Sequence, residues 1–246
     1  MATATTNLLG LGLYTAEEAA RYARLHPKTM KRWLFGDNSG TSVVNAQLRD
    51  TGERLVTFLD FVQALAIRSV RVVAKGSNPK VPLTKIRAAY DRARSEYDLD
   101  YPLATLGHRI YLFGPRERPD LCEIIVKVGD VSQPDSHSVQ LTGKSAGNRM
   151  ITRVAEQFMT ALRFDGGALP IEYRAWGNDE CAIVMNPHQS LGEPYLPSCG
   201  YTARALFEAY LSEGGIEQAA AAYGVKVEEI ELAYSYYDYL LGTEAA

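Results

Sequence analysis

The spacing of apolar positions divides the chain into helical ends and a middle rich in short strands. Near the N-terminus, apolar residues recur along one helical face between residues 19 and 25. Thr15 and Glu18, three residues apart just before that face, form the capping box that begins a helix. Pro27, which suits the first turn of a helix, opens a short second helix, "PKTMKRWLF". The sequence therefore begins with two helices joined by a turn.

After this helix pair, the pattern predicts a β-hairpin and then two more helices. The segments "TSVVNAQL" (41–48) and "RLVTF" (54–58) have the composition of strands, and Gly52 lies in the turn-rich stretch between them. Thr57 is placed to cap the strongly apolar helix "FLDFVQALAIRSVRVVA", and "KIRAAYDRARSEY" follows as another helix. The order helix, turn, helix, hairpin, helix predicts a winged helix-turn-helix.

The rest of the chain predicts strands first and helices last. "HRIYLFG", "LCEIIVKVG", "IEYRAW" and "CAIVM" have the composition of strands, whereas "NRMITRVAEQFMTALRF" (148–164) has helical spacing. From Tyr201 the chain is helical again, with a second helix-turn-helix at 216–234. We therefore expect a mainly helical α+β protein. Its three expected parts are the winged helix-turn-helix domain at 1–98, a strand-containing linker or dimerisation region at 99–165 and a small helical partner-binding domain at 166–246.

Composition is that of an ordinary globular protein and suggests a compartment. The chain of 246 residues is 46% hydrophobic and 22% charged, which is usual for a globular protein. It has no run of about 18 apolar residues that would span a membrane, and its N-terminus lacks the features of a secretory signal. Three widely separated cysteines, Cys122, Cys181 and Cys199, favour a reducing compartment over a disulfide framework. We therefore expect a cytoplasmic protein that does not contact a membrane.

The net charge of −3 conceals opposite charges at the two ends of the chain. Residues 62–94 hold eight Lys or Arg and one acidic residue, Asp91, a balance of +7. Residues 203–246 hold two basic and eight acidic residues, a balance of −6. Either run alone is typical of a solvated helix face, but opposite runs at opposite ends suggest two different kinds of partner.

The chain lacks the sequence signatures of common catalytic sites. "LTGKSAG" contains Gly-Lys-Ser, but Ser138 stands where a phosphate-binding loop requires its first glycine. The four histidines are scattered, and there is neither a zinc-binding cysteine pair nor a Gly-x-Ser-x-Gly turn. We therefore expect no metal, no cofactor and no catalytic residue. An enzyme whose site is assembled from distant residues remains an alternative.

The first helix pair carries the residue types that bind DNA. Its second helix would place cations and a threonine in the major groove, and two arginines flank the tip of the predicted wing, where they would contact the phosphate backbone. Lysine and arginine neutralise phosphates and supply most of the affinity. The predicted DNA-binding residues are Lys28, Thr29, Lys31, Arg32, Arg49 and Arg54. The alternative is a protein-docking module, because small winged helix pairs also serve that purpose.

The front of the chain also resembles a known family of regulators. "YTAEEAARYARLHPKTMKRW" is similar to the opening of MerR-type winged-helix regulators, and "ERLVTFLDFVQALAIRSVR" is similar to their wing end and following helix. The resemblance covers about residues 14–94 and implies a winged helix-turn-helix that binds operator DNA. The strand-rich middle replaces the long dimerising helix of that family, so the resemblance does not extend to its usual scheme of small-molecule sensing.

The C-terminal part resembles a different module, that of VapB-type antitoxins, which pair with PIN-type ribonuclease toxins. Its marks are Asn186-Pro187, Gly192, Pro194, Gly200 and the helix-turn-helix at 216–234. "VAEQFMTALRFDGG" before it also resembles the antitoxins that join a MerR-like front to this module. The sequence departs at Gly200-Tyr201-Thr202, where the family usually has a Gly-Thr-Arg turn, so a role of that arginine does not carry over.

The second helix of the rear helix-turn-helix carries the wrong charge for DNA. Its glutamates would meet phosphates at a few ångströms, where like charges repel. The tyrosines after them are amphipathic aromatics of the kind that anchor protein interfaces, although we expect at least two of them to pack in the domain core. The predicted partner-binding residues are Glu228, Glu231, Tyr234, Tyr236, Tyr237 and Tyr239.

Charge and resemblance together predict the antitoxin of a bacterial type II toxin–antitoxin pair. The front domain would bind double-stranded operator DNA as a homodimer, and the rear domain would bind and block a PIN-type ribonuclease toxin. The resemblance further implies that the toxin tunes repression of the shared operon. The alternative is a MerR-like transcriptional regulator whose C-terminal domain senses a ligand or dimerises.

Overall fold

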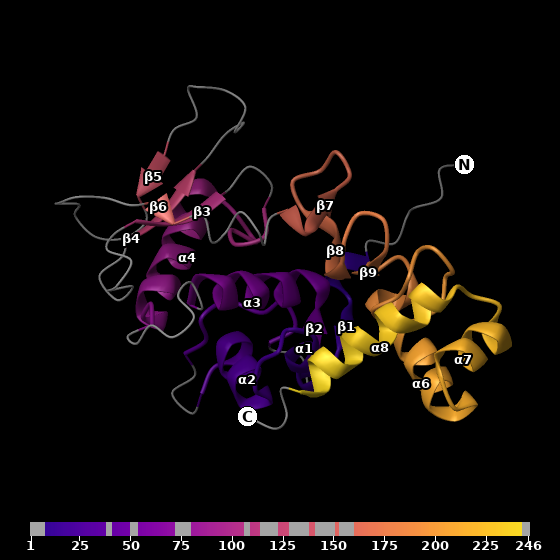
Figure 1. Ribbon diagram of the computed structural model, residues 1–246. Helices are drawn as coiled ribbons and strands as arrows, with labels where there is room; N and C mark the ends of the chain where they lie inside the picture. Colours follow the sequence, from indigo (N-terminus) through magenta and orange to yellow (C-terminus); the bar gives the residue numbers. More distant parts are fainter. Residues whose placement is uncertain are drawn as a thin grey trace, which may run out of the picture.

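The helices lie at the two ends of the chain and the antiparallel sheets lie mostly between them (Figure 1). This arrangement confirms the α+β class expected from the sequence. The computed structural model of the protein describes residues 8–37, 41–49, 54–71, 80–105, 109–113, 123–127, 138–140, 151–152 and 160–242.

The front unit is a small sheet with four helices around one core. Its elements are η1 (Leu8–Gly10), β1 (Gly12–Tyr14), α1 (Ala16–Tyr22), α2 (Pro27–Phe35), β2 (Val56–Thr57), α3 (Phe58–Arg71) and α4 (Leu83–Tyr97). The predicted capping box is confirmed, because the Glu18 amide donates to Thr15 Oγ1 at 3.1 Å and the Thr15 amide donates to Glu18 Oε2 at 2.8 Å. Thr57 caps α3 as expected, since the Asp60 amide donates to its Oγ1 at 3.1 Å.

The predicted wing hairpin is wrong in its first strand. Residues 41–49 form bends and a turn instead of the strand expected at 41–48, and β2 pairs with β1. The apolar side chains that suggested the strand, Val43 and Val44, are buried in the front core. Their amides both donate to the Trp33 carbonyl, at 2.8 and 3.3 Å. This short apolar run therefore belongs to a buried loop that is bonded to α2. Periodicity alone does not distinguish a buried strand from a buried loop.

The middle of the chain contains a four-stranded antiparallel sheet in the order β5-β4-β3-β6. Its strands are β3 (Arg109–Phe113), β4 (Glu123–Lys127), β5 (Ser138–Gln140) and β6 (Ile151–Thr152). The first two confirm the strands expected from "HRIYLFG" and "LCEIIVKVG". The helix predicted over 148–164 is wrong at its two ends, because β6 pairs with β3 and Leu162–Phe164 form strand β7, whereas Thr160 is helical as expected. β-Branched Ile151 and Thr152 suit a strand once a pairing edge is present; residues 153–159 lie outside the described residues.

The rear unit begins with a three-stranded antiparallel sheet in the order β7-β8-β9 and ends with three helices. Its elements are β7 (Leu162–Phe164), β8 (Pro170–Gly177), β9 (Ala182–Met185), η3 (Ser190–Gly192), α6 (Ala203–Glu213), α7 (Ile216–Tyr223) and α8 (Val227–Leu241). The strands expected from "IEYRAW" and "CAIVM" and the α7–α8 helix pair are confirmed. Gly224 ends α7 at φ +64°, a left-handed conformation that favours glycine.

Two clusters of buried apolar side chains hold these units together. The front cluster centres on α3, where Phe58 and Phe61 are fully buried, and it also takes in Leu162 and Met185 from the rear sheet. The rear cluster lies among α6, α7 and α8. Because the front cluster includes rear residues, the two ends of the chain pack against each other. The three-part division of the chain stays a prediction.

Candidate functional site

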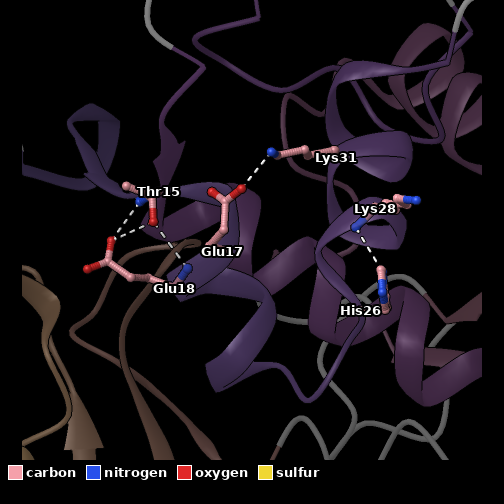
Figure 2. Close-up of polar contacts among 6 residues, drawn as sticks. All are labelled: Thr15, Glu17, Glu18, His26, Lys28 and Lys31. Carbon is pink, nitrogen blue, oxygen red and sulfur yellow. Dashed lines mark hydrogen bonds and ion pairs between the residues drawn. The ribbon is translucent and has the colours of Figure 1, made fainter. Parts of the chain in front are cut away.

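Helix α2 turns three cationic side chains to solvent and buries its apolar side. Lys28, Lys31 and Arg32 are exposed, and half-buried Thr29 lies among them, while the opposite side of the helix lies in the front core. The start of the helix is fixed by His26, whose Nδ1 accepts a hydrogen bond from the Lys28 amide at 3.2 Å (Figure 2). The four predicted DNA-binding residues of α2 therefore lie on a well-anchored helix.

One of the three cations has an acidic neighbour within the chain. Lys31 Nζ lies 2.6 Å from Glu17 Oε1 of α1 (Figure 2), and their side chains are 48% and 55% exposed. The hydrogen bond from Lys31 lowers the pKa of Glu17. Water screens such a pair, but the contact still shares the Lys31 charge with Glu17. The α2 face is therefore less positive than its sequence suggests.

The end of α3 brings a further cation, Arg71, near this face. Burial lowers the pKa of Arg71, and the positive charge of Arg32 lowers it further. Its Nη1 donates to the Val81 carbonyl at 2.8 Å, which fixes the side chain. The sequence contained one signal for this residue, the net charge of +7 over residues 62–94. That net charge does not tell which of the eight basic residues lies near α2.

The two arginines expected on a wing have different surroundings. Arg49 is half-buried and donates from Nη1 to Ser42 Oγ at 3.1 Å, whereas Arg54 is exposed just before β2. Because residues 41–49 contain no strand, the two arginines do not flank a hairpin as expected. The predicted tip, residues 50–53, lies outside the described residues. Contact of either arginine with DNA stays a prediction.

Helix α8 divides the predicted partner-binding residues into exposed and buried ones. Glu228, Glu231 and Tyr234 are exposed, the last by 37%. Tyr236 and Tyr237 retain only 1% and 7% exposure in the rear core. Their burial confirms that at least two tyrosines pack internally, and it corrects their assignment to a partner surface. The correction arises because α8 is covered on two sides, by α6 and by the front unit, so more of its circumference is buried than its composition suggested.

Tyr239, the last residue of the predicted partner set, joins α8 to the front helix pair. The guanidinium carbon of Arg24, in the turn between α1 and α2, lies 3.6 Å from the centre of the Tyr239 ring. The centre of the Trp176 ring lies 4.4 Å from the same point. Burial raises the pKa of Tyr239, but hydrogen bonds and positive charge from Arg24 and Arg68 outweigh burial and lower the pKa overall. Tyr239 therefore contacts cations of its own chain while it stays half-buried, and its contact with a partner stays a prediction.

A hydrogen bond at Gly192 joins the same two regions. The Tyr14 hydroxyl of β1 donates to the Gly192 carbonyl at 2.8 Å. Gly192 has φ +78°, and a β-carbon there would lie 2.3 Å from the Tyr14 hydroxyl oxygen. This position therefore requires glycine for two reasons, backbone conformation and close approach. Neither reason is visible in the sequence, where Gly192 is only one mark of a resemblance.

A buried carboxylate anchors the 41–49 segment to α3. Asp60 is fully buried, and its Oδ2 accepts from the Gln47 amide at 3.0 Å and from Thr57 Oγ1 at 2.9 Å. Burial raises the pKa of Asp60 to about 6, although these hydrogen bonds oppose the shift. No signal in the sequence marks this aspartate as a group that titrates closer to neutral pH.

Two kinds of site do not occur in the part of the chain that the structure describes. It contains no helix that is both long enough and apolar enough to cross a membrane. It also contains no group of three or more histidine, cysteine, aspartate or glutamate side chains arranged to hold a metal ion.

Comparisons with known proteins agree with this fold. Over 237 residues the chain is 27% identical to an uncharacterized protein, Rv2308, of Mycobacterium tuberculosis, and the alignment covers 94% of this chain and 92% of that protein. The crystal structure of Rv2018 from the same organism matches with a TM-score of 0.60 at 17% identity, over 91% of this chain and 97% of that chain. No family model matches the sequence. These similarities show a shared α+β fold and assign no activity.

Proposed function

We propose that this protein is the antitoxin of a toxin–antitoxin pair, which binds operator DNA through α2 and a PIN-type ribonuclease toxin through its rear helices. The observation that carries the proposal is the separation of charge between two helix pairs. The exposed residues of α2 include three cations, whereas the exposed charged residues of α8 are all acidic. Two faces of opposite charge on one molecule support two partners of different chemistry.

The α2 face supports the DNA half of the proposal. Its cations stand on a helix that is capped at its start and packed along its other side, so the helix can enter a major groove as a rigid unit. Arg71, beside Arg32, extends the positive surface toward the end of α3. A homodimer would present two such faces to successive half-sites and double the number of phosphate contacts.

The exposed side of α8 supports the protein half. Its glutamates repel a phosphate backbone but attract a cationic protein surface, and Tyr234 remains exposed beside them. A ribonuclease must itself carry cations where it holds the RNA backbone. Binding of α8 at such a surface would exclude RNA by occupying its place.

The salt dependence of DNA binding tests the first half. The probe is a duplex with the sequence that precedes the protein's own reading frame, titrated with the full chain at several salt concentrations. We expect Lys28→Ala/Arg32→Ala to reduce the slope of log affinity against log salt by about 0.9 for each lost phosphate contact. Arg204→Ala/Lys226→Ala removes two charges from the rear unit and is the matched control. Equal slopes for both double variants would show that α2 does not contact the backbone.

Co-expression tests the second half. The probe is the product of the neighbouring reading frame, expressed with and without the full chain, with cell growth and RNA cleavage as the measurements. We expect the full chain to restore growth and to suppress cleavage in the purified pair. A neighbouring product without ribonuclease activity, or cleavage that the chain leaves unchanged, would refute the antitoxin assignment. Truncation is unsuitable here, because it removes Gly192 and Tyr239 from their contacts with the front unit.

The contact of Arg24 with Tyr239 favours a second candidate, a MerR-like transcriptional regulator whose rear unit senses a ligand or holds a dimer. A rear helix that touches the turn of the DNA-binding pair gives such a regulator a direct physical route to its operator. Both candidates bind DNA through α2. Only the antitoxin suppresses RNA cleavage by the neighbouring product, so the co-expression experiment separates them.

A further inference from the structure

Three exposed apolar residues follow one another at seven-residue intervals along α8. Val227, Tyr234 and Leu241 are exposed by 37%, 37% and 44%. Seven residues bring an α-helix back to almost the same side, so the three side chains form one stripe along its solvent face. Apolar residues at this spacing are typical of the seam through which one helix packs against another. In the part of the chain that the structure describes, each of these side chains keeps more than a third of its surface open to solvent.

Acidic side chains border this stripe. Glu231 and Asp238 follow Val227 and Tyr234 by four residues each, which places them on the neighbouring row of the helix, and both are exposed. Helix α8 contains no lysine or arginine that could neutralise them. In paired helices, charges that border an apolar seam select a partner of opposite sign. We name the five residues Val227, Glu231, Tyr234, Asp238 and Leu241 the α8 seam.

The central residue of the α8 seam is held in place by aromatic rings of α6. The ring centre of Tyr210 lies 4.8 Å from that of Tyr234, and the ring centre of Phe207 lies 6.4 Å from it. An aromatic side chain that its neighbours already support loses little conformational entropy when a partner covers it. Tyr234 therefore has the properties of an interface anchor.

We infer that the α8 seam docks an amphipathic helix of another protein, one that carries an apolar stripe flanked by lysine or arginine. The apolar stripe would cover Val227, Tyr234 and Leu241, and the flanking cations would pair with Glu231 and Asp238. The seam is about 21 Å long at 1.5 Å per residue, so the docked helix needs about 14 residues. If the partner is the toxin, the inference rests on the proposed function, whereas the chemistry of the docked helix rests on the seam alone.

A second copy of this chain is a poor match for the seam. Helices α2 and α4 carry the required positive charge, but neither has a large apolar side chain among the described exposed ones. Pairing of α8 with α8 would place Glu231 and Asp238 opposite like charges. Among the described helices, the complementary face is therefore absent, and the occupant is a different protein.

Binding of synthetic helices to the full chain tests the inference. The probe is a labelled 18-residue peptide with leucines at seam spacing and arginines beside them. Its two comparison peptides replace every arginine by glutamate or keep the composition in shuffled order. We expect fluorescence anisotropy to detect salt-sensitive binding of the first peptide and much weaker binding of the other two. Tyr234→Ser should weaken binding about tenfold, as the loss of an interface anchor does.

A charge exchange makes the test specific to the seam. The double variant Glu231→Lys/Asp238→Lys should no longer bind the arginine peptide and should instead bind the glutamate peptide. The control Glu180→Lys/Glu217→Lys makes the same change in net charge at exposed positions outside α6 and α8, and it should keep the original preference. Circular dichroism confirms that the helices of each variant are intact. The inference is overturned if the shuffled peptide binds as tightly as the ordered one, or if both double variants change alike.

The two proposals can fail separately. If the seam variants suppress the neighbouring ribonuclease as well as the unaltered chain does, the proposed function stands and the seam is not its contact. If the unaltered chain leaves that ribonuclease active but binds the arginine peptide with the expected selectivity, the seam stands and the antitoxin assignment falls. Suppression that is lost in Glu231→Lys/Asp238→Lys and kept in Glu180→Lys/Glu217→Lys supports both.

Discussion

The two helix pairs of this protein, α1–α2 and α7–α8, have the same layout and expose opposite charges. Each joins two helices through a turn that contains a residue at positive φ, Arg24 at +47° and Gly224 at +64°. Helix α2 presents cations to solvent, whereas α8 presents acids and tyrosine. The layout therefore determines how the helices pack, whereas the exposed side chains determine which partners they attract.

The helix pairs also differ in how they are anchored. Helix α2 buries one side in the front core, and a buried carboxylate, Asp60, fixes the neighbouring loop. Helix α8 is covered on two sides, by α6 and by the front unit, and its tyrosines fill both contacts. A smaller part of α8 is therefore free to meet a partner.

Loss of a buried tyrosine from α8 should have the largest effect. Tyr236→Ala leaves a cavity in the rear core, and we expect the free energy of unfolding to fall by about 3–5 kcal/mol. Tyr236→Phe should be close to neutral, because the hydroxyl is buried without a hydrogen-bond partner. Tyr234→Ala, on the exposed side, should cost less than about 1 kcal/mol. Urea denaturation measures all three, and equal losses at both positions would contradict the two-sided burial of α8.

The anchor of the front unit should make stability depend on pH. The pKa of folded Asp60, about 6, lies above the value of about 3.9 in an unfolded chain. The folded state therefore holds this proton more tightly. Its contribution to stability is fully present below about pH 4 and is lost as the pH rises through about 6, a change of roughly 3 kcal/mol.

Substitution of Asp60 isolates this contribution. Asp60→Asn cannot ionise, so the decline in the free energy of unfolding between about pH 4 and 6 should flatten relative to the unaltered chain. Asp238→Asn, at an exposed position of α8, is the control and should retain the decline. Urea denaturation across this pH range gives both slopes. A variant at Asp60 with an unchanged slope would show that another group causes the dependence.

The contact between the helix pairs should give the smallest of the three effects. Arg24→Asn removes the cation and keeps a residue type that tolerates positive φ, and Tyr239→Leu removes the aromatic ring but keeps an apolar side chain. A double-mutant cycle with these two changes should show a coupling of about 1 kcal/mol in the free energy of unfolding. Strictly additive effects would mean that the cation and the ring do not stabilise each other.

Local signals predicted the parts of the fold that depend on neighbours in sequence. Thr15 and Glu18 form their capping box within four residues, and Pro27 opens α2 where its fixed φ suits the first turn. The wing could not be predicted in the same way, because the partner of β2 is β1, far earlier in the chain. Which strand pairs with β2 depends on tertiary packing, and the apolar run at 41–48 carries no information about it.

The candidate site was predictable in charge and not in geometry. The cations of α2 and the acids of α8 follow from the sequence, since charged side chains on helices are seldom buried. The roles of Tyr236, Tyr237 and Tyr239 depend on which elements pack against α8. Two of these elements, α6 and the turn between α1 and α2, come from different parts of the chain. The ion pair of Lys31 with Glu17 likewise depends on how α1 lies against α2.

The hydrogen bond from Tyr14 to Gly192 also bears on the order in which the protein is completed. Its two residues are 178 positions apart. At a synthesis rate of roughly 5–20 residues per second, the acceptor follows the donor by about 10–35 seconds. During that interval a nascent chain holds the first helix pair without the carbonyl that Tyr14 binds and without the ring that covers Arg24. The first helix pair is thus completed late, because its final contacts wait for the synthesis of Gly192 and of α8.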